Sequence, residues 1–288
     1  MSGSGVRNPE RAVAMDRATV DGAELEYEVK GSGEPVLLIP PGPVAGAFLP
    51  FLSERALVER YRVIRYHRRG QAGSTPVTAP VSFADHASDA AALLAHLGVR
   101  RAHVAGHSFG GNIALQLALD HPEVVQTLAL LEPWTFAVPS AEAFLKQAEP
   151  VLEAYGAGDR EGAMASFLSA VSGLDWETCR TVIDEHVPGG ADRALVEADF
   201  SFASDLPALN AWTFGPEQAT TISQPVLSVR GAQSGQLFVE VGDLLRSWFP
   251  QVEELTLKGA GHLLQIQRPE PVAEGLAEFM GHHPCAPG

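Results

Sequence analysis

The sequence has few cysteines and no long apolar run. Its two cysteines, Cys179 and Cys285, lie far apart, and neither belongs to a Cys-x-x-Cys pair. A disulfide framework and a zinc cluster are therefore not expected, and a reducing cytoplasm is the favoured compartment. No stretch of about 18 apolar residues occurs, so the sequence predicts no membrane span.

Basic residues are also scarce, 20 against 35 acidic ones, which gives a net charge of −15 at pH 7. Nucleic acids and anionic membranes attract proteins through a basic face, so neither is expected as a partner. No Gly-x-Gly-x-x-Gly follows the first predicted parallel strand, which argues against a nicotinamide-dependent oxidoreductase. We predict no cofactor and no metal.

The pattern of apolar residues predicts an α/β protein with a doubly wound, mostly parallel sheet. A β-hairpin is expected over 17–29, and buried strands over 35–39, 61–66, 102–105, 125–131, 225–230 and 253–257. Helices are expected between them, over 47–57, 82–97, 111–121, 239–248 and 271–280.

The alternation of strands and helices stops at Pro133 and resumes near residue 221. The segment between is rich in helical patterns, which predicts a lid over the carboxyl edge of the sheet. The expected division is an α/β core over 16–134 and 221–283, a helical lid over 135–220, and a disordered or tag-like lead-in over 1–15.

The strand at 102–105 runs into Gly106-His107-Ser108-Phe109-Gly110, and a helix pattern follows at once. Gly-x-Ser-x-Gly between a strand and a helix is typical of a nucleophile elbow, a strained turn that exposes its serine above the sheet. Glycines flank the serine because a side chain there would collide with the crossing backbone. Ser108 is the predicted nucleophile.

A serine hydroxyl needs a base to become nucleophilic. His262 is the best of the ten histidines, because it lies in the glycine-rich loop Lys258-Gly259-Ala260-Gly261-His262 directly after the last predicted strand. Functional groups of open α/β sheets gather at that edge. His107, beside the nucleophile, is expected to serve packing instead.

The imidazole needs a carboxylate partner, and two strand ends could carry it. No carboxylate occurs from Gly231 to Gln236, after the later strand, whereas Glu132 follows the strand at 125–131 immediately. Glu132 is therefore the predicted acid. A Ser–His dyad, with Glu132 only ordering the entrance to the lid, stays open.

Backbone amides should bind the oxyanion of the tetrahedral intermediate. Phe109 follows the nucleophile and supplies one amide. The other is expected from the loop after 35–39, Pro40-Pro41-Gly42-Pro43, in which Gly42 has the available N–H because proline has none.

The serine elbow, the interrupted alternation and the Gly-Ala-Gly-His loop together resemble the α/β-hydrolase fold family over about residues 17–282. The loop over 68–74 is similar to the family's Arg-Gly-x-Gly-x-Ser loop, although Ala72 separates its glycines and Gln71 is unusual. Ser234 stands where the family commonly has its aspartate.

The earlier position of the acid is similar to that in haloalkane dehalogenases. Those enzymes use an aspartate as nucleophile, and the serine at position 108 excludes their chemistry. A glutamate at this position together with a Pro-x-Gly oxyanion loop is similar to the fungal zearalenone lactonases. That resemblance implies lactone or aryl ester substrates.

Together these residues predict a cofactor-free serine hydrolase that cleaves a carboxylic ester or lactone with a hydrophobic body. Aromatic residues expected to line its pocket, or else to form ordinary lid core, are Trp134, Trp176, Trp212 and Phe214. C–C bond hydrolysis or another acyl transfer on the same residues stays open, as does a non-catalytic small-molecule sensor. Substrate identity, lid conformation and a homodimeric state are likewise open.

Overall fold

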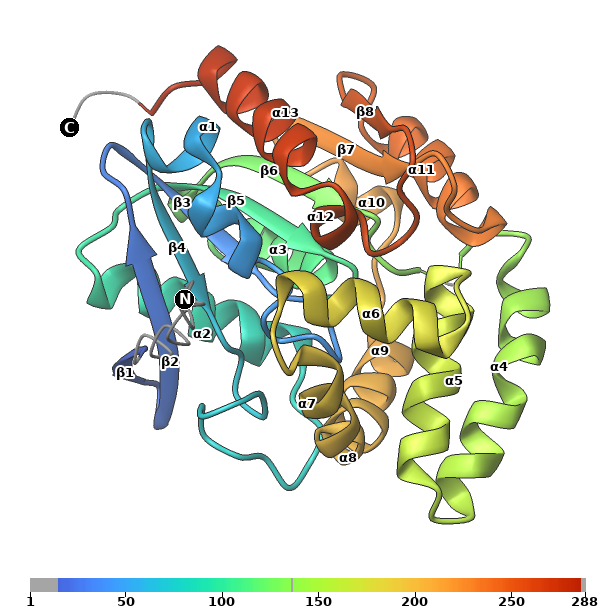
Figure 1. The fold of residues 1–288 in the computed structure, drawn as a ribbon. Helices are drawn as coiled ribbons and strands as arrows, with labels where there is room; N and C mark the ends of the chain where they lie inside the picture. Colours follow the sequence, from blue (N-terminus) through green and yellow to red (C-terminus); the bar gives the residue numbers. More distant parts are fainter. Residues whose placement is uncertain (1–14, 136, 286–288) are drawn as a thin grey trace, which may run out of the picture.

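The computed structural model describes residues 15–135 and 137–285. Residues 1–14 of the lead-in expected over 1–15 therefore lie outside the described residues. Eight strands form one sheet in the order β1-β2-β4-β3-β5-β6-β7-β8 (Figure 1). The strands are β1 (Asp16–Val20), β2 (Ala23–Lys30), β3 (Glu34–Ile39), β4 (Tyr61–Tyr66), β5 (Ala102–His107), β6 (Val125–Leu131), β7 (Val226–Gly231) and β8 (Glu253–Leu257).

Only the first two pairings of this sheet, β1 with β2 and β2 with β4, are antiparallel. The remaining neighbours run parallel, because helices return the chain to the same end of the sheet each time. The predicted doubly wound, mostly parallel sheet is confirmed.

Helices cover both faces of the sheet. One face packs against α2 (Phe83–His96), α3 (Phe109–Asp120) and α11 (Gln236–Trp248), whose buried apolar side chains join those of the strands. The other face packs against α1 (Arg55–Val58), α12 (Leu264–Gln267) and α13 (Pro269–His282). Apolar strands buried on both sides are what a parallel sheet requires.

The single helix expected over 47–57 is wrong. The chain forms a 3₁₀ turn, η1 (Leu49–Ser53), and then the short helix α1. Pro50 lies in the first turn of η1, where its missing N–H does no harm, but it could not continue a longer helix begun at residue 47. Glu54 between the two pieces is extended, with ψ 112°, which breaks the helix again.

The chain between β6 and β7 is helical and is called the helical insertion below. Its helices are α4 (Ala141–Gly156), α5 (Arg160–Ser172), α6 (Trp176–His186), α7 (Gly190–Val196), α8 (Ala198–Phe200), η3 (Ser201–Asp205), α9 (Leu206–Ala211) and α10 (Pro216–Ala219).

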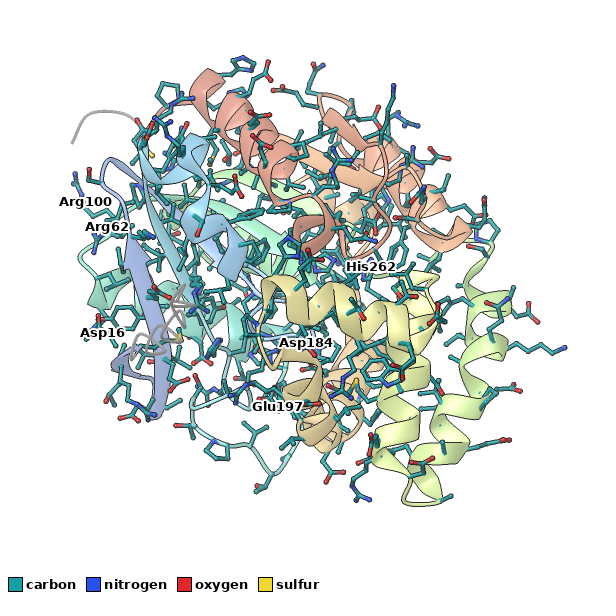
Figure 2. All side chains as sticks on the ribbon, viewed as in Figure 1. Asp16, Arg62, Arg100, Asp184, Glu197 and His262 are labelled. Carbon is teal, nitrogen blue, oxygen red and sulfur yellow. The ribbon has the colours of Figure 1, made fainter. Side chains whose placement is uncertain are left out.

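Most of the helical insertion lies together at one side of the sheet (Figure 1), and Figure 2 shows His262 beside it. It has an apolar core of its own, which includes Met164, Leu168 and Ile183 and reaches Val44 and Leu263 in loops of the sheet. These contacts attach the insertion over the ends of the parallel strands. Among residues 15–135 and 137–285, no helix has the length and apolar character needed to cross a membrane.

Candidate active site

The predicted elbow forms between β5 and α3. Ser108 has φ 53° and ψ −122°, a conformation that non-glycine residues rarely adopt and that is typical of strained functional turns. A Cβ on Gly106 would lie 2.2 Å from the Gly110 carbonyl oxygen, and one on Gly110 would lie 2.3 Å from that of Ile39. Both positions therefore need glycine, as the motif predicted.

The structure brings His262 and Glu132 together. His262 Nδ1 lies 2.7 Å from Glu132 Oε2, and both side chains are almost fully buried. Glu132 follows β6, which pairs directly with β5, so the acid and the serine leave neighbouring strand ends. Like Ser108, Glu132 has a positive φ, of 44°. The bond to Nδ1 leaves Nε2 of the imidazole to act as a base.

The second oxygen of Glu132 is held from the neighbouring strand β7. Oε1 accepts hydrogen bonds from the Gly231 amide at 2.8 Å and from the Ser234 hydroxyl at 2.5 Å. The sequence marked Ser234 only as the residue that replaces the family's common acid. In the structure it donates to the acid at the earlier strand, and the two donors orient that carboxylate toward His262.

Phe238 and His107 contact the His262 ring and its loop. Phe238 stacks on the ring, with centroids 4.0 Å apart and an interplanar angle of 12°. His107 Nε2 lies 2.8 Å from the His262 carbonyl oxygen, and Gln265 Nε2 lies 2.7 Å from His107 Nδ1. Burial holds the pKa of His107 well below its ordinary value, so a neutral ring can donate from one nitrogen and accept at the other.

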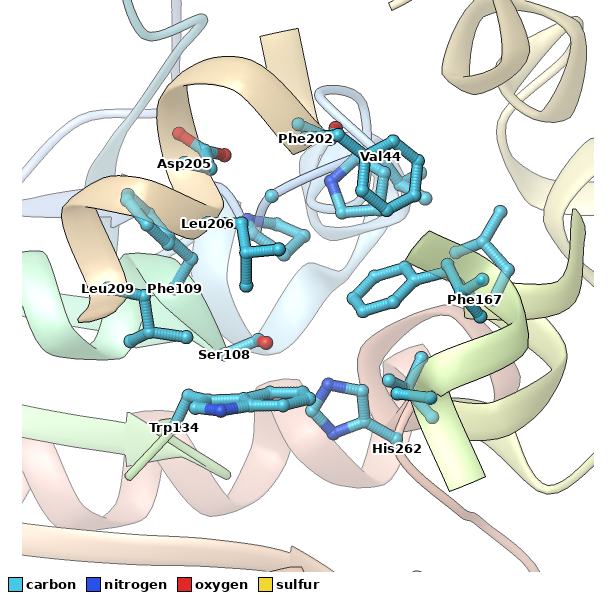
Figure 3. Close-up of a pocket in the computed structure, with 18 of the residues that line it drawn as sticks. Val44, Ser108, Phe109, Trp134, Phe167, Phe202, Asp205, Leu206, Leu209 and His262 are labelled. Atoms are coloured by element: carbon cyan, nitrogen blue, oxygen red, sulfur yellow. The ribbon is translucent and has the colours of Figure 1, made fainter. Parts of the chain in front are cut away.

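Ser108 and His262 line the same cavity, into which the serine hydroxyl points (Figure 3). Within the part of the chain that the structure describes, no hydrogen bond joins Ser108 Oγ to the imidazole. Hydrogen bonds between a nucleophile and its base are often long or absent until substrate is bound.

Two backbone amides of residues that line this cavity have no protein acceptor among the described residues. In the described chain neither the Phe109 amide nor the Gly42 amide donates a hydrogen bond to protein. Phe109 opens α3, where the first amides have no partner within the helix. Gly42 also lines the cavity. Both predicted oxyanion donors are thus unpaired.

The cavity has a volume of about 120 Å³, and most of its lining is apolar. The loops after β3 and β6 contribute Val44 and Trp134. Both ends of the Asn112 side-chain amide bind the Trp134 backbone. The helical insertion contributes most of the rest, including Phe144, Leu145, Leu152, Phe167, Phe202, Leu206 and Leu209. Figure 3 shows Phe167 and Leu206 facing Ser108 across the cavity.

Three of the four aromatic residues expected in this pocket lie elsewhere, which corrects that expectation. Trp176 packs against the core of the helical insertion. Trp212 and Phe214 stack on each other and line a separate hollow that Trp134 also borders. The lining residues of the insertion were missed because helical periodicity shows which side chains are buried but not which face turns toward Ser108.

A buried ion pair, also missed from sequence, borders the cavity. Asp205, at the end of η3, lines it and receives Arg68 Nη1 at 3.0 Å and Nη2 at 2.7 Å. Burial raises the pKa of Asp205, and the guanidinium of Arg68 opposes that rise. No lysine or arginine is among the described residues that line the cavity.

Potential metal ligands gather at the opposite end of the sheet. Glu34 begins β3, His103 lies near the start of β5, and Cys285 comes close to both. His103 Nε2 already lies 3.1 Å from Glu34 Oε2. None of these three residues lines the Ser108 cavity.

Comparisons with known proteins agree with this architecture. A family model described as the alpha/beta hydrolase fold matches residues 35–269. A presumed carbamate hydrolase, RutD, of Caulobacter segnis is 28% identical over 275 residues, which span 92% of this chain and 99% of that protein.

Solved structures share the fold. The enol-lactonase of Burkholderia xenovorans LB400 superposes with a TM-score of 0.78 at 21% identity, covering 92% of this chain and 100% of that one. Est816, an N-acyl homoserine lactone degrading enzyme, superposes with a TM-score of 0.70 at 25% identity, with the same coverage.

Proposed function

Because the chain belongs to the alpha/beta hydrolase fold family and is a hydrolase, we propose that it cleaves a neutral carboxylic ester or lactone through an acyl-enzyme on Ser108. The observation that carries the proposal is the bond from His262 Nδ1 to Glu132 Oε2 at the wall of the cavity that holds the serine. A buried carboxylate bound to one ring nitrogen orients the other as a base.

In this mechanism the Ser108 hydroxyl attacks the substrate carbonyl while His262 Nε2 takes its proton. Glu132 stabilises the imidazolium that forms, and the Phe109 and Gly42 amides bind the oxyanion. The imidazolium then returns the proton to the leaving alcohol, and an acyl-enzyme remains. His262 then takes a proton from water, which attacks the acyl carbonyl, and the imidazolium returns that proton to Ser108 Oγ as the acyl–oxygen bond breaks, which releases the acid and the free serine.

The cavity supports a small, apolar and uncharged acyl group. Its volume of about 120 Å³ is close to the roughly 150 Å³ of a protein cavity that admits benzene. Among the described lining residues no lysine or arginine offers a cation to a second carboxylate, and Asp205 is already paired with Arg68. The similarity to Est816, a lactone-degrading enzyme, supports a lactone as substrate. The similarity to RutD is a reason to include an alkyl carbamate among the substrates tested.

The proposal is tested by Ser108→Ala against p-nitrophenyl butyrate. We expect kcat/KM to fall by about 10³-fold or more, because only oxyanion binding and substrate binding then remain. Ser201→Ala is the matched control, since that hydroxyl lines the same cavity and has no hydrogen-bond partner among the described residues. Turnover unchanged by Ser108→Ala would refute the proposal.

A further inference from the structure

The loop after β3 is held by side chains from another loop. The Pro41 carbonyl oxygen accepts hydrogen bonds from Gln71 Nε2 at 2.9 Å and from Arg68 Nη2 at 3.2 Å. Gln71 Nε2 also lies 2.5 Å from the Gly42 carbonyl oxygen. Arg68 and Gln71 both belong to the loop after β4 and are fully buried. Neither of them lines the Ser108 cavity.

The Pro41 carbonyl and the Gly42 amide belong to the same peptide plane. No cis peptide occurs in the described chain, and in a trans peptide the C=O and N–H bonds point in opposite directions. Two donors that hold the carbonyl toward the protein interior therefore turn the Gly42 N–H away from it. That N–H has no protein acceptor in the part of the chain described, and Gly42 lines the cavity.

We infer that Gln71 and Arg68 are positioning residues that aim the Gly42 amide at the oxyanion. The inference rests on the proposed function and extends it to residues that do not touch substrate. It also gives a physical role to Gln71, the unusual member of the loop over 68–74. Pro40 and Pro43 stiffen the same loop but have no N–H of their own to offer the oxyanion.

The two positioning side chains are themselves fixed. Gln71 Oε1 accepts from the Arg68 amide at 3.2 Å, so its NH₂ group must face the two carbonyls. The Arg68 guanidinium is bound by both oxygens of Asp205 and lies 4.6 Å from the centroid of the Phe109 ring. A carbonyl held by donors that cannot rotate is preorganised, which is what an oxyanion site needs.

The test uses Gln71→Met, which keeps the length of the side chain and removes its donor. We expect kcat for p-nitrophenyl butyrate to fall by about tenfold or more with KM nearly unchanged, since a misaimed oxyanion donor acts in the transition state only. Affinity for butylboronic acid, which forms a tetrahedral adduct on the serine, should fall by a similar factor.

Ser74→Ala is the matched control on the same loop. Ser74 is buried, donates to the His67 carbonyl and accepts from the Glu26 amide, but it does not touch Pro41 or Gly42. It should lower the unfolding temperature without changing the boronate affinity. Equal losses of kcat and boronate affinity in both variants would assign Gln71 a merely structural role and overturn the inference.

Unchanged kcat and boronate affinity in Gln71→Met would also overturn it, provided that Ser108→Ala abolishes turnover. Unchanged turnover in Ser108→Ala would instead refute the proposed function, so the two failures are distinguishable. If Gln71→Met does not fold, Gln71→Asn keeps the amide but is one methylene too short to reach Pro41. It is expected to show the same loss of kcat and boronate affinity, and normal values would refute the inference.

Discussion

Glu132 forms hydrogen bonds through both of its carboxylate oxygens. One of its oxygens binds His262, and the other binds the Gly231 amide and the Ser234 hydroxyl. Its positive φ places the carboxylate there at a cost in backbone strain. The missing carboxylate after β7 was enough to predict Glu132 from sequence. The bond from Ser234 was not predictable, because a side chain's direction after a strand depends on the turn that follows.

Replacing Glu132 tests its role. In Glu132→Gln we expect kcat to fall by about 10²- to 10⁴-fold, since an amide does not stabilise the imidazolium and can hold the wrong tautomer. Adding Ser234→Asp to that variant should restore at least about tenfold, because position 234 lies within hydrogen-bonding distance of position 132. Ester hydrolysis by the two variants at equal folded concentration checks this. A Glu132→Gln enzyme close to wild type would indicate a Ser–His dyad.

His86 gives a prediction for the pH dependence of stability. Burial, with Arg68 and Arg69 nearby, holds its pKa well below the ordinary value of about 6.5. Below pH 6.5 His86 binds a proton in the unfolded chain but stays neutral in the folded chain. The free energy of unfolding therefore falls as the pH drops. The slope from this histidine approaches about 1.4 kcal/mol per pH unit.

Chemical unfolding of His86→Gln and wild type between pH 7 and 5 isolates this effect. The buried Asp205, whose raised pKa acts in the opposite sense, is present in both proteins and cancels in the difference. The variant should lose less stability than wild type on acidification. Parallel stability curves would contradict a neutral buried His86.

At the scale of elements, α4 forms one wall of the cavity. Two of its leucines line the cavity and are still about half exposed, Leu145 at 46% and Leu152 at 49%. Apolar side chains in that position can contact an apolar substrate as it enters the cavity. Only Ala141 and Val151 of the helix are buried, so its orientation depends on its packing against α5.

Leu152→Glu should raise KM for p-nitrophenyl butyrate about fivefold with little change in kcat, because it removes apolar contact area from the mouth of the cavity. Val196→Glu is the control, since Val196 is 84% exposed on α7 and does not line the cavity. Steady-state kinetics of both variants decide the matter. An equal rise in KM in both variants would mean that the added negative charge, and not the lost contact with α4, raises KM.

Element boundaries show where sequence reasoning succeeds and where it stops. Strands with buried apolar runs and the helix α2, which begins at a capping box of Ser82 and Asp85, were predictable from local patterns. The broken helix over 47–57 was not, because Pro50 can begin a helix as well as end one. The aromatic residues of the helical insertion were misplaced for a different reason, since tertiary packing alone decides which face meets the cavity.

At the scale of the whole molecule, a net charge of −15 and a cavity without lysine or arginine among its described lining residues both disfavour anionic substrates. We expect kcat/KM for a mono-p-nitrophenyl succinate to be at least about tenfold below that for the butyrate. The difference should shrink as salt is added, because the long-range part of the repulsion is screened over about 8 Å at 0.15 M. Similar values for both esters would contradict the neutral-substrate proposal.

The most direct test of the central claim is intact-protein mass spectrometry after reaction with an alkyl fluorophosphonate. The account predicts one phosphonyl group per chain, located on Ser108, with much slower labelling in His262→Gln and none in Ser108→Ala. A native protein that stays unlabelled, or that is labelled equally when Ser108 is alanine, would contradict an activated serine at this site.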